Sequence, residues 1–245
     1  MTEILIAHRG EPVTWPENSL QGYREVLAAG ARYIETDVQI TADGVAVLSH
    51  DPSLHRLTGR DLIVTDTPAD TVLSLPAGYP ERFGDRYRDY RISTMAEFAA
   101  LLTDWPQARA FVEIKHASIN AFGTDRVIGI MLETLADVLG QCILISFEYA
   151  ALAHARERTD LPLGWVLPHW DDEHRQMAEN LAPDYLFVNH KRLPPLPAAL
   201  WDGPWQWVVY TVNRAEEISL YLESGFAMIE TNEIRSLLGG QSGHE

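Results

Sequence analysis

Short apolar runs alternate with longer amphipathic stretches from one end of the chain to the other. The apolar or β-branched runs have the length of β-strands and lie at residues 4–7, 33–40, 111–115, 142–147, 163–167, 185–188, 207–212 and 227–230. The stretches with helical spacing of apolar positions lie at residues 19–29, 94–103, 127–139, 149–158, 171–180 and 215–223. This alternation predicts an α/β fold built on a parallel sheet.

The number of strand-like runs distinguishes between the common α/β folds. Eight runs in 245 residues match a (β/α)₈ TIM barrel, with a doubly wound sheet as the alternative. No G-x-G-x-x-G turn follows a run, so the main sign of a dinucleotide-binding sheet is missing. We therefore expect one TIM-barrel domain over residues 1–245. Asn18 is the expected N-cap of the first helix, and Gly30 is the expected glycine at its end.

One connection departs from this alternation. The run at 33–40 is followed by the turn sequence Asp43-Gly44 and by another short run, with no room for a helix. Strands joined this closely must be antiparallel, and Asp-Gly is a strong hairpin signal. Residues 51–93, rich in Arg, Asp, Pro and Gly, then predict a small insertion or cap.

The register of this hairpin decides where His50 lies. If Thr41 lies opposite Gly44, then Glu35 lies opposite His50 and Asp37 lies opposite Leu48. Opposed residues share a face of the sheet, so His50 would lie beside both carboxylates. A slip of one residue would turn His50 to the other face.

Three carboxylates occupy the ends of strand-like runs. Glu35 and Asp37 are two residues apart on one strand and therefore share a face, and Glu113 has the same setting on the next barrel strand. An outward, solvated pair is the alternative. Both faces of a barrel strand are covered, however, and unpaired buried charges are costly. Three oxygen ligands therefore predict a site for Mg²⁺ or Ca²⁺.

Two cations accompany these carboxylates. Lys115 shares a face with Glu113, and it is one of only two lysines in the chain, the other being Lys191. A structural salt bridge is one interpretation of Lys115, and a contact to a phosphate is the other. Arg9 would add a planar guanidinium that can bind two phosphate oxygens.

Two histidines end strand-like runs close to these charges. His8 ends the first run and His50 ends the hairpin, and imidazole can both accept and donate the protons that phosphodiester cleavage requires. Asp51 either orients His50 or caps the next turn. Tyr210, at another strand end, is either a wall of the substrate pocket or a packing residue.

Composition limits the partners and the compartment. The net charge of −16 argues against nucleic acids and anionic membrane surfaces, which favour basic patches. No apolar run is long enough to span a bilayer and none resembles a signal peptide, so we expect a cytoplasmic protein without stable membrane association. The single cysteine, Cys142, excludes an internal disulfide. These features leave a small molecule as the expected partner, and the candidate histidines, carboxylates and cations indicate a phosphodiester.

Together these segments resemble the glycerophosphodiester phosphodiesterase family over nearly the whole chain. The matching motifs are His8-Arg9-Gly10, Pro16-Glu17-Asn18-Ser19, Glu35-x-Asp37 with Thr41-x-Asp43-Gly44, His50-Asp51, Glu113-x-Lys115, Ser146-Phe147 and Thr211-Val212-Asn213. The resemblance implies a TIM barrel and a hydrolase that depends on Mg²⁺ or Ca²⁺ and releases glycerol 3-phosphate and an alcohol. The residues to which it assigns roles are His8 and His50 as the acid–base pair, Glu35, Asp37 and Glu113 as metal ligands, Arg9 and Lys115 as the phosphate contacts, and Glu17 as a positioning partner of Arg9.

The sequence departs from this family in two places that concern the substrate. Tyr210 stands where the family usually has tryptophan, and Asn232 stands where it usually has aspartate. Neither change removes a catalytic group. The alternatives for function are a lysophospholipase D or sphingomyelinase D-like activity in the same site, or a catalytically silent phosphodiester-binding barrel.

Overall fold

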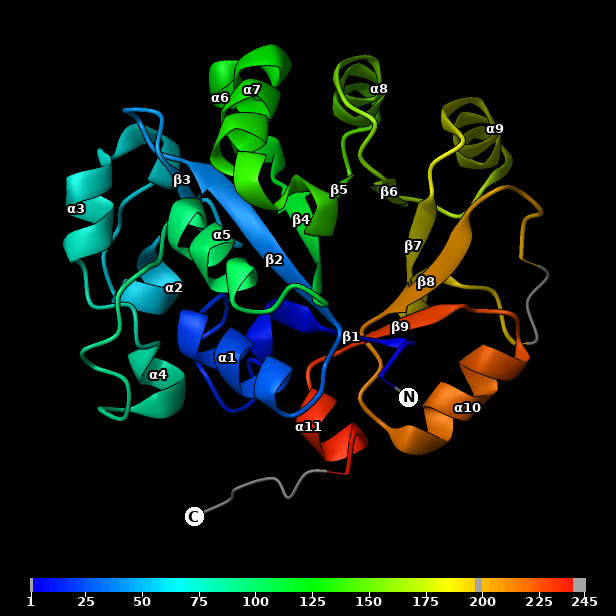
Figure 1. The fold of residues 1–245 in the computed structure, drawn as a ribbon, viewed down its shortest axis with the longest axis horizontal. Coiled ribbons are helices and arrows are strands. Elements are labelled where there is room, and N and C mark those ends of the chain that lie inside the picture. The colour runs from blue at the N-terminus through cyan, green and yellow to red at the C-terminus, as the bar shows by residue number, and fades with distance from the viewer. Residues whose placement is uncertain (1, 197–199, 240–245) are drawn as a thin grey trace.

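A closed barrel of eight parallel strands forms the centre of the computed structural model, which describes residues 2–196 and 200–239 (Figure 1). The strands are β1 (Leu5–Ala7), β2 (Tyr33–Ile40), β4 (Arg109–Ile114), β5 (Cys142–Ser146), β6 (Leu163–Val166), β7 (Tyr185–Asn189), β8 (Gln206–Tyr210) and β9 (Met228–Thr231). Each pairs with the next, and β1 pairs with both β9 and β2, which closes the barrel. The predicted (β/α)₈ fold is confirmed.

Helices surround the barrel and cover its outer face (Figure 1). Those that match the expected stretches are α1 (Leu20–Ala28), α5 (Met95–Thr103), α7 (Thr124–Thr134), α8 (Tyr149–Arg158), α9 (Asp172–Leu181) and α10 (Ala215–Glu223). Two short helices, α6 (His116–Phe122) and α11 (Ile234–Leu237), were not expected. The helix expected at 127–139 ends early, because a 3₁₀ segment at Ala136–Gln141 follows α7. None of the described helices is long and apolar enough to cross a bilayer.

The alternation of side chains along each strand separates two cores. A large apolar cluster fills the space between the barrel and its helices. A smaller cluster fills the barrel itself, and its buried members are Ile6, Phe111, Ile143, Ile145, Val166, Phe187, Val208 and Met228. Because side chains two residues apart share a face, polar residues that follow these positions point into the same end of the barrel. Active sites of TIM barrels lie at this carboxyl end of the strands.

The start of α1 differs from the prediction. Ser19, not Asn18, is the N-cap, because its side chain accepts a hydrogen bond from the backbone N–H of Gly22 at 3.1 Å. Asn18 is buried and points toward β2 instead. Gly30 ends the helix at φ +99°, as predicted.

The contact between α1 and the turn after β1 requires a glycine. A Cβ atom at Gly22 would lie 2.4 Å from the carbonyl oxygen of Gly10. We expect Gly22→Ala to lower the free energy of unfolding by roughly 1–3 kcal/mol, because backbone must move to relieve the overlap. Urea unfolding measures this change, with Gly140→Ala as the control, since a Cβ atom there meets nothing within 4 Å. Equal stability of the two variants would contradict the expectation.

The hairpin forms, but its predicted register is wrong by one residue. Strand β3 (Ala46–Leu48) pairs antiparallel with β2, and Val38 lies opposite Leu48. The turn contains three residues, 42–44, and Gly44 adopts φ +92°, as three-residue hairpin loops require. A pairing continued from this register would turn His50 away from Glu35. The strand ends at Leu48, however, and the chain leaves the ladder before His50.

The insertion after the hairpin folds around its own small core. It contains α2 (His55–Thr58), a 3₁₀ turn at Val64–Asp66, α3 (Ala69–Ser74) and α4 (Pro80–Phe83). These short elements gather at one side of the barrel, next to β2 and β3 (Figure 1). Its buried apolar side chains pack with one from the hairpin, and they are Val47, Leu54, Leu57, Val64, Val72, Ala77 and Ile92.

Candidate active site

The three predicted carboxylates come together at the carboxyl ends of two neighbouring strands. Strands β2 and β4 pair so that Asp37 lies directly opposite Glu113, and Glu35 lies two residues earlier on the same face as Asp37. One oxygen from each of these three side chains lies within 4.8 Å of the others. Glu35 and Asp37 are almost completely buried. The register of two barrel strands thus concentrates three acidic groups in a space that water barely reaches.

Arg9 and Lys115 compensate part of this negative charge. Arg9 Nε lies 2.9 Å from Asp37 Oδ2, and Lys115 Nζ lies 2.6 Å from both Asp37 Oδ1 and Glu113 Oε1. Burial alone would raise the pKa of Asp37, but Arg9 and Lys115 outweigh it and hold this pKa well below its usual range. Burial would likewise lower the pKa of Lys115, but Asp37 and Glu113 raise it above its usual value.

Two carboxylate oxygens in this cluster lack hydrogen-bond donors. Within the described residues, Glu35 Oε1 and Asp37 Oδ1 are buried without a directed hydrogen bond, although Lys115 lies close to the second. Burial, and then the neighbouring Asp37 and Glu230, raise the pKa of Glu35 well above its usual value. A divalent cation would supply the missing partner, because Mg²⁺ and Ca²⁺ take oxygen ligands of this kind. The carboxylates of Glu35, Asp37 and Glu113 therefore fit a metal ion.

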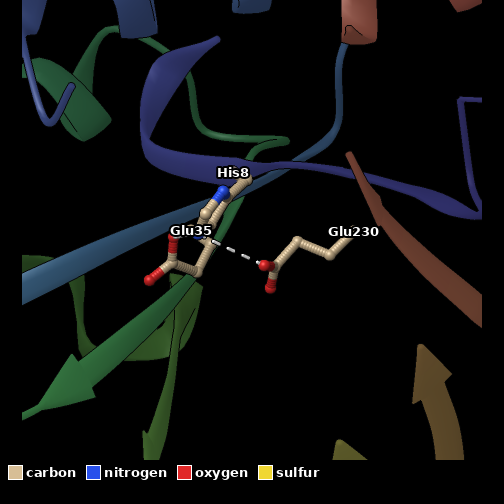
Figure 2. A group of neighbouring side chains, drawn as sticks. All are labelled: His8, Glu35 and Glu230. Carbon is tan, nitrogen blue, oxygen red and sulfur yellow. Dashed lines mark ion pairs between the residues drawn. The ribbon is translucent and has the colours of Figure 1, made fainter. Parts of the chain in front are cut away.

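His8 lies beside this cluster in a fixed orientation. Its Nδ1 is 2.7 Å from Asn232 Oδ1, so the amide oxygen accepts the Nδ1 proton and Nε2 is left as an acceptor. Nε2 lies 3.5 Å from Glu230 Oε1 and 3.9 Å from Glu35 Oε2 (Figure 2). Burial, reinforced by the charge of Arg9, lowers the pKa of His8 to about 3. The imidazole is therefore neutral at pH 7.

His50 reaches the same cavity from the segment after β3, where Gln39 donates a hydrogen bond to its carbonyl oxygen. Its Nδ1 lies 2.6 Å from Asp51 Oδ1, which decides between the two interpretations of Asp51 in favour of orienting His50. Arg56 on α2 then donates from Nε to the other oxygen of Asp51 at 2.6 Å. It also donates two hydrogen bonds of 2.7 Å to Glu17.

Glu17 connects this chain of contacts to Arg9, because its Oε1 lies 3.6 Å from an Arg9 terminal nitrogen. The insertion therefore contributes Arg56, whose guanidinium contacts Asp51, the partner of His50, and Glu17, the partner of Arg9. Asp51 and Arg56 form a pair of opposite charge in which the carboxylate accepts hydrogen bonds from both sides. These contacts, and burial that opposes them, leave the pKa of Asp51 well below its usual range.

One cavity of about 180 Å³ lies at this site, and its charged and imidazole lining consists of His8, Arg9, Glu35, His50, Glu113, Lys115 and Glu230. Its lining divides into a charged side from the turn after β1 and from β2 and β4, and a mainly apolar side from β5 to β8. The apolar side is lined by Ile145, Phe147, Val166, Phe187 and Tyr210. Tyr210 thus lines the cavity, and burial raises the pKa of its hydroxyl above its usual value. The cavity can hold a small molecule with one anionic and one apolar part.

The family model for the glycerophosphoryl diester phosphodiesterase family matches residues 8–236. The chain belongs to this family. As a member it is an enzyme, a phosphoric diester hydrolase, and the resemblance in its motifs is confirmed over nearly its whole length.

Individual relatives agree with the family match. The chain is 26% identical to a glycerophosphodiester phosphodiesterase of Caldanaerobacter subterraneus subsp. tengcongensis over 97% of each chain. Its fold is similar to that of an Oleispira antarctica phosphodiesterase solved with the product sn-glycerol-3-phosphate, with a TM-score of 0.82, 21% identity and coverage of 96% and 95%. It is also similar to the glycerophosphodiester phosphodiesterase of Thermotoga maritima, with a TM-score of 0.68, 22% identity and coverage of 96% and 97%.

Four residues of this phosphodiesterase site were not assigned to it from the sequence. Asn18 donates a hydrogen bond of 2.9 Å to Asp37 Oδ2, Arg56 contacts Asp51 and Glu17, and Asn232 orients His8. Glu230 lines the cavity next to His8. Side-chain alternation could have revealed Glu230, because it lies two residues after the inward-facing Met228. No sequence signal shows the contacts of the other three, which depend on the tertiary fold.

Proposed function

We propose that this chain hydrolyses glycerophosphodiesters to glycerol 3-phosphate and an alcohol in a reaction that depends on Mg²⁺ or Ca²⁺. One observation carries the proposal. Two histidines, each with Nδ1 bound to a polar side chain, face a cavity that is also lined by Glu35, Glu113 and two cations, and the third carboxylate of the cluster, Asp37, is buried against both cations. The product named for the O. antarctica relative, sn-glycerol-3-phosphate, is small enough for this cavity.

Glu35, Asp37 and Glu113 would hold the metal ion. The unpaired Glu35 oxygen, and the excess of carboxylates over cations in the cluster, support a divalent cation there. When bound, such an ion stabilises the negative charge that develops on the phosphoryl oxygens.

His8 and His50 would transfer the protons. Neutral His8 has an unprotonated Nε2 toward the cavity, which suits it to accept the proton of the attacking water molecule as the water oxygen bonds to phosphorus. His50, with Nδ1 against Asp51, presents Nε2 to the cavity and would protonate the leaving alcohol.

Arg9 and Lys115 would bind the phosphate of the substrate. Both line the cavity, and both already contact Asp37, so their charge is held in place before the substrate arrives. Fixed cations of this kind stabilise a transition state without reorganising during the reaction. Glu17 would keep the guanidinium of Arg9 in position.

An assay of the purified chain tests this proposal. Glycerophosphocholine and glycerophosphoethanolamine should release glycerol 3-phosphate and the free alcohol in Mg²⁺ or Ca²⁺, and a chelator should abolish the release. Lysophosphatidylcholine and sphingomyelin in the same panel test the lysophospholipase D and sphingomyelinase D alternatives. No turnover of any diester with either metal would contradict the proposal and favour a silent phosphodiester-binding barrel.

The structure gives the lipid alternative little support. An enzyme for lysophospholipids needs an apolar surface for the acyl chain. The apolar side chains of the insertion instead pack into its own core, and Ile63 is its one large exposed hydrophobic residue among those described. We therefore expect diesters without acyl chains to be preferred.

A further inference from the structure

Glu230 is a buried carboxylate that no part of the proposed mechanism uses. It lies on β9, its side chain is 5% exposed, and it lines the cavity. In the described part of the chain no group donates a hydrogen bond to its carboxylate. Its one close polar contact is His8 Nε2 at 3.5 Å, visible as the dashed line in Figure 2. A carboxylate this deeply buried requires donors, and the cavity is where they can come from.

The contact with His8 does not satisfy Glu230. The 3.5 Å between His8 Nε2 and Glu230 Oε1 exceeds the usual length of an N–H···O hydrogen bond, and Nδ1 of the same ring is already bound to Asn232. The imidazole nitrogen of His8 and the carboxyl group of Glu230 therefore face the same space without satisfying each other (Figure 2). A ligand hydroxyl directed at Glu230 would supply its missing hydrogen-bond partner and leave His8 Nε2 free for the proton of the nucleophile.

The surroundings of Glu230 indicate which part of a ligand lies there. Tyr210 on β8 lies on one side along the barrel wall, and the apolar lining of β5 to β7 continues from it. Arg9 and Lys115, the expected phosphate contacts, lie on the charged side beyond His8. Glu230 thus lies between the phosphate contacts and the apolar lining. The part of a ligand that reaches it is the carbon-containing group bonded to the phosphate.

We infer that Glu230 is a specificity-determining residue that binds a free hydroxyl of the substrate's glycerol moiety. The inference rests on the proposed function, since it names the part of a glycerophosphodiester that this carboxylate recognises. A free hydroxyl of the glycerol donates a hydrogen bond to Glu230, while His8 Nε2 remains available to the nucleophile. An enzyme built in this way discriminates against diesters whose glycerol is acylated or lacks this hydroxyl, because a buried acceptor is then left unpaired.

Kinetics with three substrates test the inference. They are glycerophosphocholine, propylphosphocholine, which lacks both hydroxyls, and the ethyl ester of glycerol phosphate, which lacks the ammonium group. Glu230→Leu should lower kcat/KM roughly 10- to 100-fold for both glycerol esters, because the glycerol hydroxyl is then left without a partner in a buried site. It should change the rate with propylphosphocholine less than threefold. Glu230→Gln, which keeps an acceptor, should show a smaller loss with the same pattern.

Controls separate this inference from other roles of Glu230. Glu133→Gln changes an exposed carboxylate on α7 and should leave all three rates unchanged. Equal losses on all three substrates would indicate a structural role, and a loss confined to the choline esters would indicate an ammonium site. Weaker Mg²⁺ binding by Glu230→Gln would make Glu230 a metal ligand. Each of these results would overturn the inference.

The wild-type chain distinguishes this inference from the proposed function. If it hydrolyses none of the three diesters with either metal, then the proposed function itself is wrong. If it hydrolyses them and the Glu230 variants do not discriminate between glycerol and propyl esters, then only the role of Glu230 is wrong.

Discussion

Replacing either His8 or His50 with alanine should reduce kcat for glycerophosphocholine by roughly 10²- to 10⁴-fold, the usual contribution of a general acid or base. The physical reason is the same for both residues. Each imidazole has one nitrogen bound to a fixed partner, Asn232 or Asp51, and thus presents the other to the cavity. Steady-state kinetics at saturating metal measure the loss.

Metal binding provides the control for this result. Neither histidine is one of the three proposed metal ligands. Titration calorimetry should therefore show that both variants bind Mg²⁺ or Ca²⁺ with nearly unchanged affinity. His154→Ala, on the outer face at α8, should retain full activity. If kcat stays within threefold of the wild type in both variants, the acid–base assignment is wrong.

The second large effect is on the free energy of unfolding, and it should differ between the neighbouring carboxylates Asp37 and Glu35. Asp37→Asn should lower the free energy of unfolding of the metal-free protein by about 3–5 kcal/mol, because it leaves buried Arg9 and Lys115 without their shared partner. Glu35→Gln should leave the stability unchanged or increase it. Its Oε1 has no donor in the described structure, and Asp37 and Glu230 both disfavour its charge.

Thermal unfolding with and without metal measures both parts of this prediction. A ligand that binds only the folded state raises stability by mass action, so wild-type Tm should rise with Mg²⁺ or Ca²⁺. Both variants should lose most of this rise. An Asp37→Asn variant as stable as Glu35→Gln would show that Arg9 and Lys115 do not depend on Asp37. A full metal-induced shift in both variants would exclude these carboxylates as ligands.

The barrel was predictable because its signals are local. Each strand is a short apolar run and each helix has its own periodicity, and eight such units in 245 residues leave few alternatives. The positions of Glu35, Asp37, Glu113 and Lys115 follow from the same logic. Side chains two residues apart share a face, and a buried face cannot hold unpaired charge.

The errors arose where tertiary contacts decide between similar local choices. Asn18 and Ser19 are both good N-caps, but the side chain of Asn18 is already bound to the side chains of Tyr23, Thr36 and Asp37. The hairpin register differed by one residue because the turn uses Gly44 as a third loop position. His50 still reaches the cavity because Gln39 holds the chain after β3 ends. The pattern of apolar and polar residues in the sequence does not predict this hydrogen bond.

The closure of the barrel has a consequence for when the site can form during synthesis. The proposed metal ligands, phosphate contacts and histidines all lie within the first 115 residues, so they leave the ribosome early. His8, however, takes its orientation from Asn232, 224 positions away, and β1 pairs with β9. The nascent chain therefore contains all of these residues during most of translation, but they are not yet assembled into a site. We expect the chain to hydrolyse its substrate only after β9 has been synthesised and has paired with β1.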